Sequence, residues 1–164
     1  MDANQARAQL WSMIKDIKFA MLVTEQEDGT LRSRPMATQQ AEFDGDLWFF
    51  TAVDAPKVAE VRYHSKVNLS YAEPDDQKYV SVSGTCEVVR DNAKMKELWN
   101  PVYKAWFPNG LDDPRLTLLK VTVTNAEYWD APAGKMVYLI GYVKAMATGE
   151  QYKPSADEHQ KLKM

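Results

Sequence analysis

Six segments with the composition of β-strands constrain the fold of this chain more than any other feature. Most are rich in branched or aromatic residues or alternate between apolar and polar residues, and they end at turn signals or at the start of a helix. They cover residues 19–24, 31–34 with an imperfect continuation to 40, 47–51, 67–72, 79–90 and 118–129. Closing an antiparallel sheet buries one face of every strand and removes exposed edges. We therefore expect a mainly β fold, a small six-stranded antiparallel barrel with flanking helices, in which the first three strands form a meander.

Helical spacing is confined to the segments between these strands. Residues 3–15 place apolar side chains on one helical face, namely Ala6, Leu10, Met13 and Ile14. Asp54 is predicted to cap a second helix that ends near His64. Asp91 is predicted to cap a third, which Pro101 interrupts. These helices are too few and too short to form a layer of their own.

The C-terminal part carries a weaker signal. Residues 136–147 fit an amphipathic helix that Gly149 would end, and a strand is the alternative interpretation. From residue 150 the chain is polar and charged, without periodic apolar residues. We expect a single domain over residues 1–149 and a flexible polar tail over 150–164.

Composition narrows the classes of function. The formal net charge of −3 provides no broad cationic field, which argues against nucleic acid as a partner. The single cysteine, Cys86, excludes an intrachain disulfide, and its place in an alternating run favours a buried strand residue over a nucleophile. No apolar stretch is long enough for a signal peptide or a membrane span, so a cytoplasmic protein that does not bind membranes is expected.

Cationic and hydroxyl groups gather between Arg32 and Lys57 in a pattern that suits a planar phosphorylated ligand. Arg34 has a planar fork of donors that matches a phosphate, Lys57 is a point charge at a helix start, and Thr51 adds a hydroxyl. The helix that begins near Ala55 contributes free backbone N–H groups and the positive end of its dipole. For any one of the charged residues alone, a solvated surface charge is the competing interpretation.

Apolar residues in the same stretch provide a wall for a ring. Pro35 withholds a donor from the sheet, which predicts an edge strand or a bulge where a ligand can meet free backbone groups. Met36 either contacts the ring or fills the core. Phe49 and Phe50 point to opposite faces of one strand, so at most one of them lines a given pocket.

Other kinds of chemistry lack a motif. His64 and His159 lie in unrelated segments, which argues against a metal site. The chain has no Gly-rich phosphate loop, no nucleophile elbow and no paired-cysteine motif, so hydrolytic chemistry has no visible machinery.

Four motifs together resemble the general stress protein 26 group of the pyridoxamine 5′-phosphate oxidase-like FMN-binding split-barrel superfamily. They are Ser33-Arg34-Pro35-Met36, Leu47-Trp48-Phe49-Phe50-Thr51, Ala55-Pro56-Lys57 and Tyr128-Trp129-Asp130. The resemblance covers roughly residues 10–149. It implies a six-stranded split barrel that forms a homodimer, with one FMN in each of two clefts at the subunit interface and both subunits contributing to each site.

The resemblance also implies roles for single residues. By position, Arg34 opens the flavin-contacting strand, and Thr51 and Lys57 are phosphate ligands. Where the oxidases have a serine-arginine-lysine run, this chain has Ala55-Pro56-Lys57 and lacks one phosphate arginine, so weaker FMN binding is expected. Tyr79 falls near a position that is often glutamine, and Trp129 approaches the flavin from the late strand. The implied cofactor-binding set is Ser33, Arg34, Pro35, Met36, Phe49, Phe50, Thr51, Pro56, Lys57, Tyr79 and Trp129.

The function that this resemblance implies is an FMN-dependent, stress-associated oxidoreductase of unknown substrate, in which N5 of the flavin exchanges hydride. A non-catalytic protein that stores or senses flavin is the alternative, and a split barrel that uses F420 or haem is a third possibility. The terminal segment that binds substrate in the oxidases has no counterpart after Gly149. Its absence argues against vitamin B6 oxidation.

Overall fold

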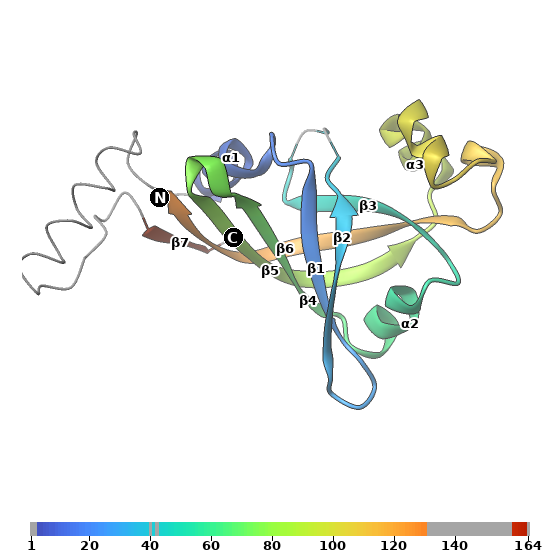
Figure 1. Ribbon diagram of the computed structural model, residues 1–164, viewed down its shortest axis with the longest axis horizontal. Helices are drawn as coiled ribbons and strands as arrows, with labels where there is room; N and C mark the ends of the chain where they lie inside the picture. The colour runs from blue at the N-terminus through green and yellow to red at the C-terminus, as the bar shows by residue number, and fades with distance from the viewer. Residues whose placement is uncertain (1–2, 40, 42, 131–158, 164) are drawn as a thin grey trace, which may run out of the picture.

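The strands pair into one antiparallel sheet in the order β2-β1-β4-β5-β6-β3, and a short β7 also pairs with β6 (Figure 1). The computed structural model describes residues 3–39, 41, 43–130 and 159–163. The sheet curls into a split barrel, which confirms the predicted mainly β fold with flanking helices. The strands are β1 (Phe19–Glu25), β2 (Leu31–Ala37), β3 (Asp46–Ala52), β4 (Lys66–Glu73), β5 (Lys78–Val89), β6 (Leu116–Asp130) and β7 (His159–Lys163).

Strand alternation places the core inside the curl. Phe49 of β3 is 1% exposed. Leu22 of β1 and Leu69 of β4, which face each other across these two paired strands, are fully buried. Burying a side chain of this size stabilises the fold by about 1.5–3 kcal/mol. Helix α1 (Ala3–Ile14) adds the predicted face of Ala6, Leu10, Met13 and Ile14 to the same core.

The predicted meander of the first three strands is wrong in its last step. β1 and β2 form the expected hairpin, but β3 pairs with β6, where Thr51 lies opposite Thr117. Pro35 has no N–H to give a further neighbour, and β2 pairs only with β1 among the described strands. The expected edge position of Pro35 is thereby confirmed, and β3 crosses to the far end of the sheet.

The remaining helices lie at the ends of the strands. Helix α2 (Pro56–Tyr63) follows β3, but its N-cap is Ala55, so the predicted cap at Asp54 is wrong. Asp91 caps α3 (Asn92–Leu98) as predicted, since its side chain accepts from the N–H groups of Ala93 and Lys94. Three 3₁₀ helices complete the described chain: η1 (Pro74–Asp76), η2 (Pro101–Ala105) and η3 (Gly110–Asp112). None of the described helices combines the length and the apolar character needed to cross a membrane.

The last described residues differ from the expected loose tail. His159–Lys163 forms strand β7, whose Leu162 pairs with Ala126 of β6 and is 5% exposed. One buried leucine and a ladder of backbone hydrogen bonds hold these residues against the sheet, although their other side chains are polar. The segments predicted as a helix over 136–147 and as the first part of the tail lie outside the described residues.

Candidate functional site

A cavity of about 330 Å³ opens between β2, β3, the start of α2 and the η2 segment. This volume lies at the lower end of the range for small-ligand sites. The cavity lies between the two edge strands β2 and β3, because the curl of the sheet brings these opposite ends of the strand order together. Its lining comprises Phe19, Pro35, Met36, Ala37, Gln39, Phe50, Thr51, Ala52, Ala55, Lys57, Tyr103, Trp106 and Phe107.

One end of the cavity is cationic. The Nζ atom of Lys57 donates to the hydroxyl of Thr51 at 3.4 Å, and Thr51 is itself buried. Burial, and then the nearby charge of Arg34, lower the pKa of Lys57 from its ordinary value. No carboxylate of the described residues forms an ion pair with this ammonium group. Its remaining donors can therefore meet an anionic ligand.

The start of α2 adds a backbone donor at the same end. No side chain caps the helix at Ala55, and Pro56 has no N–H. The N–H of Val58 bonds to the carbonyl of Ala55, which leaves the N–H of Lys57 as the first-turn donor for a ligand. The helix dipole also favours negative charge at this point.

Another part of the lining is aromatic. The ring of Phe50 lies 5.6 Å from that of Trp99 and 5.5 Å from that of Tyr103. The hydroxyl of Tyr103 donates to Oε1 of Gln39 at 3.0 Å, and Trp106 stays 59% exposed at the cavity. A planar apolar group would find a rigid surface here.

The structure decides which phenylalanine of β3 faces the cavity. Phe50 lines it, whereas Phe49 points into the barrel core. Met36 is 5% exposed and belongs to the core, as one of its two interpretations holds, and it also lines the cavity.

Sequence reasoning missed the aromatic wall. Tyr103, Trp106 and Phe107 lie beyond Pro101, where the sequence predicts that the third helix is interrupted. The available signal was the density of aromatic residues between Trp99 and Phe107, next to two prolines, where a plain surface turn would be polar.

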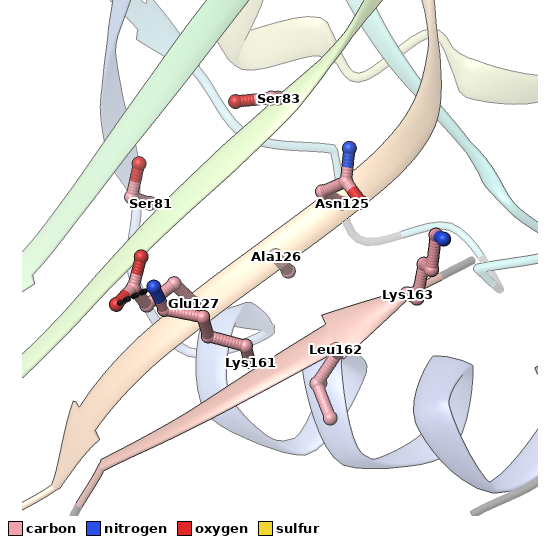
Figure 2. Close-up of a pocket in the computed structure, with 8 residues that line it drawn as sticks. All are labelled: Ser81, Ser83, Asn125, Ala126, Glu127, Lys161, Leu162 and Lys163. Atoms are coloured by element: carbon pink, nitrogen blue, oxygen red, sulfur yellow. Dashed lines mark ion pairs between the residues drawn. The ribbon is translucent and has the colours of Figure 1, made fainter.

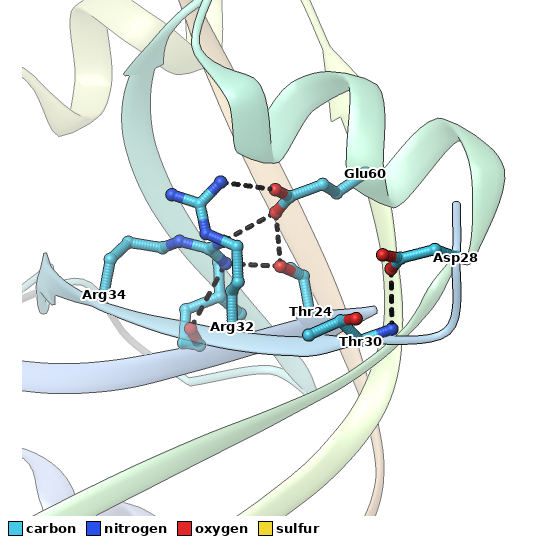
Figure 3. A network of polar contacts seen from close by, with 7 residues as sticks. Thr24, Asp28, Thr30, Arg32, Arg34 and Glu60 are labelled. Carbon is cyan, nitrogen blue, oxygen red and sulfur yellow. Dashed lines mark hydrogen bonds and ion pairs between the residues drawn. The ribbon is translucent and has the colours of Figure 1, made fainter. Parts of the chain in front are cut away.

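Arg34 lies outside the cavity lining, in a buried network (Figure 3). Its Nη2 atom lies 2.6 Å from Oε2 of Glu60, and its Nη1 atom donates to the hydroxyl of Thr24 at 2.5 Å. Burial alone would raise the pKa of Glu60, but the bonds from Thr24 and Arg34 bring it below its ordinary value. The guanidinium predicted to meet a phosphate is therefore engaged by protein groups.

Four further residues of the predicted set also stand apart from the cavity in this chain. Ser33 lies on the exposed side of β2, and Pro56 is exposed at the start of α2. Tyr79 and Trp129 face each other across β5 and β6. Along β6, Trp129 lies twelve residues beyond Thr117, a path of roughly 40 Å.

A second groove runs between β5, β6 and β7 (Figure 2). Its charged groups are partly matched to one another, since Glu127 lies 3.6 Å from Nζ of Lys161 and 2.6 Å from Nε2 of His159. The aromatic ring of Trp129 stacks on His159 beside it. Within the described ranges no three His, Cys, Asp or Glu side chains are placed to hold a metal ion.

Comparison with known proteins connects this geometry to one family. Residues 5–153 match the model of the family described as pyridoxamine 5′-phosphate oxidase like. The chain is 32% identical over 135 residues to protein bli-3 of Neurospora crassa, an alignment that covers 76% of this chain. The chain spans 65% of the length of that relative.

Solved structures agree with the family match. A candidate general stress protein 26 of Jannaschia sp. CCS1 superposes with a TM-score of 0.75 at 25% identity, over 98% of this chain and 99% of the other. The general stress FMN/FAD binding protein of Xanthomonas citri superposes with a TM-score of 0.69 at 28% identity. This match covers 80% of this chain and 93% of the other. The suspected kinship with general stress protein 26 is thereby confirmed.

Proposed function

The chain belongs to the pyridoxamine 5′-phosphate oxidase-like family, and from this premise we propose that it is a flavin-binding general stress protein that holds FMN in the cavity between β2, β3, α2 and η2. The observation that carries the proposal is the union of a cationic end with an aromatic wall in a single cavity. The similarity to a protein described as FMN/FAD binding supports a flavin as the ligand.

The donor set fits a phosphate monoester at one end. Lys57 supplies a charge-assisted hydrogen bond and its backbone N–H, and Thr51 supplies a hydroxyl. Pro35, Met36 and Phe50 form the apolar side against which the ring packs. The modest volume suits one nucleotide better than a dinucleotide, which favours FMN over FAD.

We further propose a flavin-dependent oxidoreductase of unknown substrate. A bound flavin supplies hydride or electron transfer. The described cavity lining contains no histidine, cysteine or carboxylate. The chain's own residues therefore hold and orient the ligand through Lys57, Thr51 and Gln39, and they exclude water with aromatic rings. The same observation is compatible with a protein that only stores or senses flavin.

A homodimer would complete the cavity. Tyr79 and Trp129 are 44% and 39% exposed at the far end of β5 and β6, although both are large and partly apolar. Phe19, at the edge of the cavity, and Met21 on the same strand are also exposed. We propose that a second copy covers these residues and brings its Tyr79 and Trp129 to the flavin. Sedimentation of FMN-loaded protein tests this arrangement, and a monomer with tightly bound FMN would contradict it.

Titration of the purified protein with FMN tests the main proposal. We expect quenching of flavin fluorescence and a shifted flavin absorbance spectrum. The absorbance spectrum of any cofactor that purifies with the protein separates FMN from F420 and haem. A protein that changes neither signal refutes the flavin assignment. Anaerobic reduction of the bound flavin by NADH or NADPH would favour the enzyme, and its absence with both would favour storage or sensing.

A further inference from the structure

The carboxylate of Glu60 gathers three donors from two strands beneath α2 (Figure 3). Its Oε2 atom accepts from the hydroxyl of Thr24 on β1 at 2.5 Å and from Nη2 of Arg34 on β2 at 2.6 Å. Its Oε1 atom accepts from Nη1 of Arg32 on β2 at 3.2 Å. Glu60 is only 7% exposed. A carboxylate this deeply buried needs such partners to remain charged.

Helix α2 depends on such contacts for its position. It is only eight residues long and has no side-chain N-cap. Isolated helices of this length are marginal in water, so tertiary contacts decide where it lies. Its other buried residues are Val58 and Val61. Glu60 is therefore the polar attachment of α2 to β1 and β2, one turn after Lys57.

We propose that Glu60 is a positioning residue for the phosphate end of the cavity: it ties α2 to β1 and β2, engages the guanidinium of Arg34, and thereby holds Lys57 beside Thr51 as the cation that binds the phosphate monoester. This inference rests on the proposed function. It gives a role to a side chain that lies outside the cavity lining and acts only through Lys57.

The charges around Lys57 predict how the pH dependence of FMN binding changes when Glu60 is replaced. The groups that face its ammonium are Arg34 from β2, Glu60 from α2 and the hydroxyl of Thr51 from β3. Burial and Arg34 lower the pKa of Lys57, and Glu60 raises it. Removing the negative charge of Glu60 lowers that pKa further. FMN binding should then fail at a lower alkaline pH than in the wild type.

The test compares the dissociation constants of FMN and riboflavin in full-length Glu60→Gln. Because riboflavin has the same ring and no phosphate, the ratio of the two constants isolates phosphate recognition. We expect Glu60→Gln to reduce the preference for FMN by about tenfold, the usual scale of one lost charge-assisted contact. In a Lys57→Ala background it should cause no further loss. Glu87→Gln is the matched control, since Glu87 is exposed and pairs with Lys120 away from the cavity.

Equal losses for both ligands, an additive loss in the Lys57→Ala background, or an unmoved alkaline limit would overturn the positioning role of Glu60. If Glu60→Gln does not fold, Arg32→Gln tests the positioning role instead. The Arg32 side chain is 49% exposed, and its replacement removes only one of the partners of Glu60. We expect it to reduce the ratio by about threefold, and an unchanged ratio would overturn the inference. A wild-type protein that binds no FMN would instead refute the proposed function.

Discussion

The hydroxyl of Thr51 and the ammonium group of Lys57 lie 3.4 Å apart, at the point where β3 ends and α2 begins. A short connection between a buried strand and a helix start fixes both groups before any ligand arrives. Preorganised donors of this kind lose little freedom on binding.

Replacing Lys57 should therefore weaken the binding of the phosphate group much more than the binding of the flavin ring. We expect Lys57→Ala to weaken FMN by about 10- to 100-fold and riboflavin by less than about threefold, because only FMN loses a charge-assisted hydrogen bond. Thr51→Val should also weaken FMN more than riboflavin, with a smaller loss of FMN affinity than Lys57→Ala. Fluorescence titration of both ligands measures the difference, and Lys104→Ala, at an exposed position of η2, is the control. Equal losses for the two ligands would place Lys57 away from the phosphate.

The neighbouring phenylalanines of β3 should behave in opposite ways. Phe49→Ala should destabilise the fold by about 3–5 kcal/mol, because it leaves a cavity in the core. Phe50→Ala should cost less in stability and should weaken both FMN and riboflavin, since its ring faces the ligand cavity. Urea unfolding and flavin titration on the same two variants provide the measurements. Normal flavin affinity in folded Phe50→Ala would contradict the assigned ring wall.

Lowering the pH should reduce the stability that the hydrogen-bonded network around Glu60 contributes. The folded-state pKa of Glu60 lies below its ordinary value. Its contribution to stability is therefore full above the pKa of the unfolded chain and is lost as pH falls through the lower folded-state pKa. We expect the free energy of unfolding to decline below about pH 5, and to decline less steeply in Glu60→Gln. Urea unfolding between neutral and acid pH measures both slopes; identical slopes would show that Glu60 does not titrate as described.

Gly84 allows a test of the barrel that is independent of the site. The pairing of β5 with β6 shifts register between Ser83 and Gly84, and a Cβ at Gly84 would overlap the carbonyl oxygen of Thr122. Because backbone cannot yield cheaply, Gly84→Ala should destabilise the protein by about 1–3 kcal/mol. Thr85→Ala, one residue later on the same strand and at an exposed position, is the control. Thermal unfolding measures both variants, and a fully stable Gly84→Ala would mean that the strands separate easily there.

Local patterns predicted much of this protein. The alternation of apolar residues located β1 to β6, the helical spacing placed the buried face of α1, and Asp91 marked the start of α3. The grouping of Thr51 with Lys57 also followed from sequence, since the two lie only six positions apart, at a strand end and a helix start. Each of these features depends on neighbours within a few residues, where periodicity and capping chemistry act directly.

Only the tertiary structure decided the long-range relationships. The pairing of β3 with β6 depends on which distant strand has a free edge, and the sequence of β3 does not indicate its partner. The engagement of Arg34 by Glu60 joins positions 26 residues apart, so a guanidinium that looks free in the sequence becomes a structural ion pair. Tyr103 and Trp106 reach the cavity only because the segment after α3 folds back beside β3. Sequence by itself determined the strands and the donors at the cationic end of the cavity, because these arise from local periodicity. The fold determined which donors remain free for a ligand, because that depends on which buried charges must be paired.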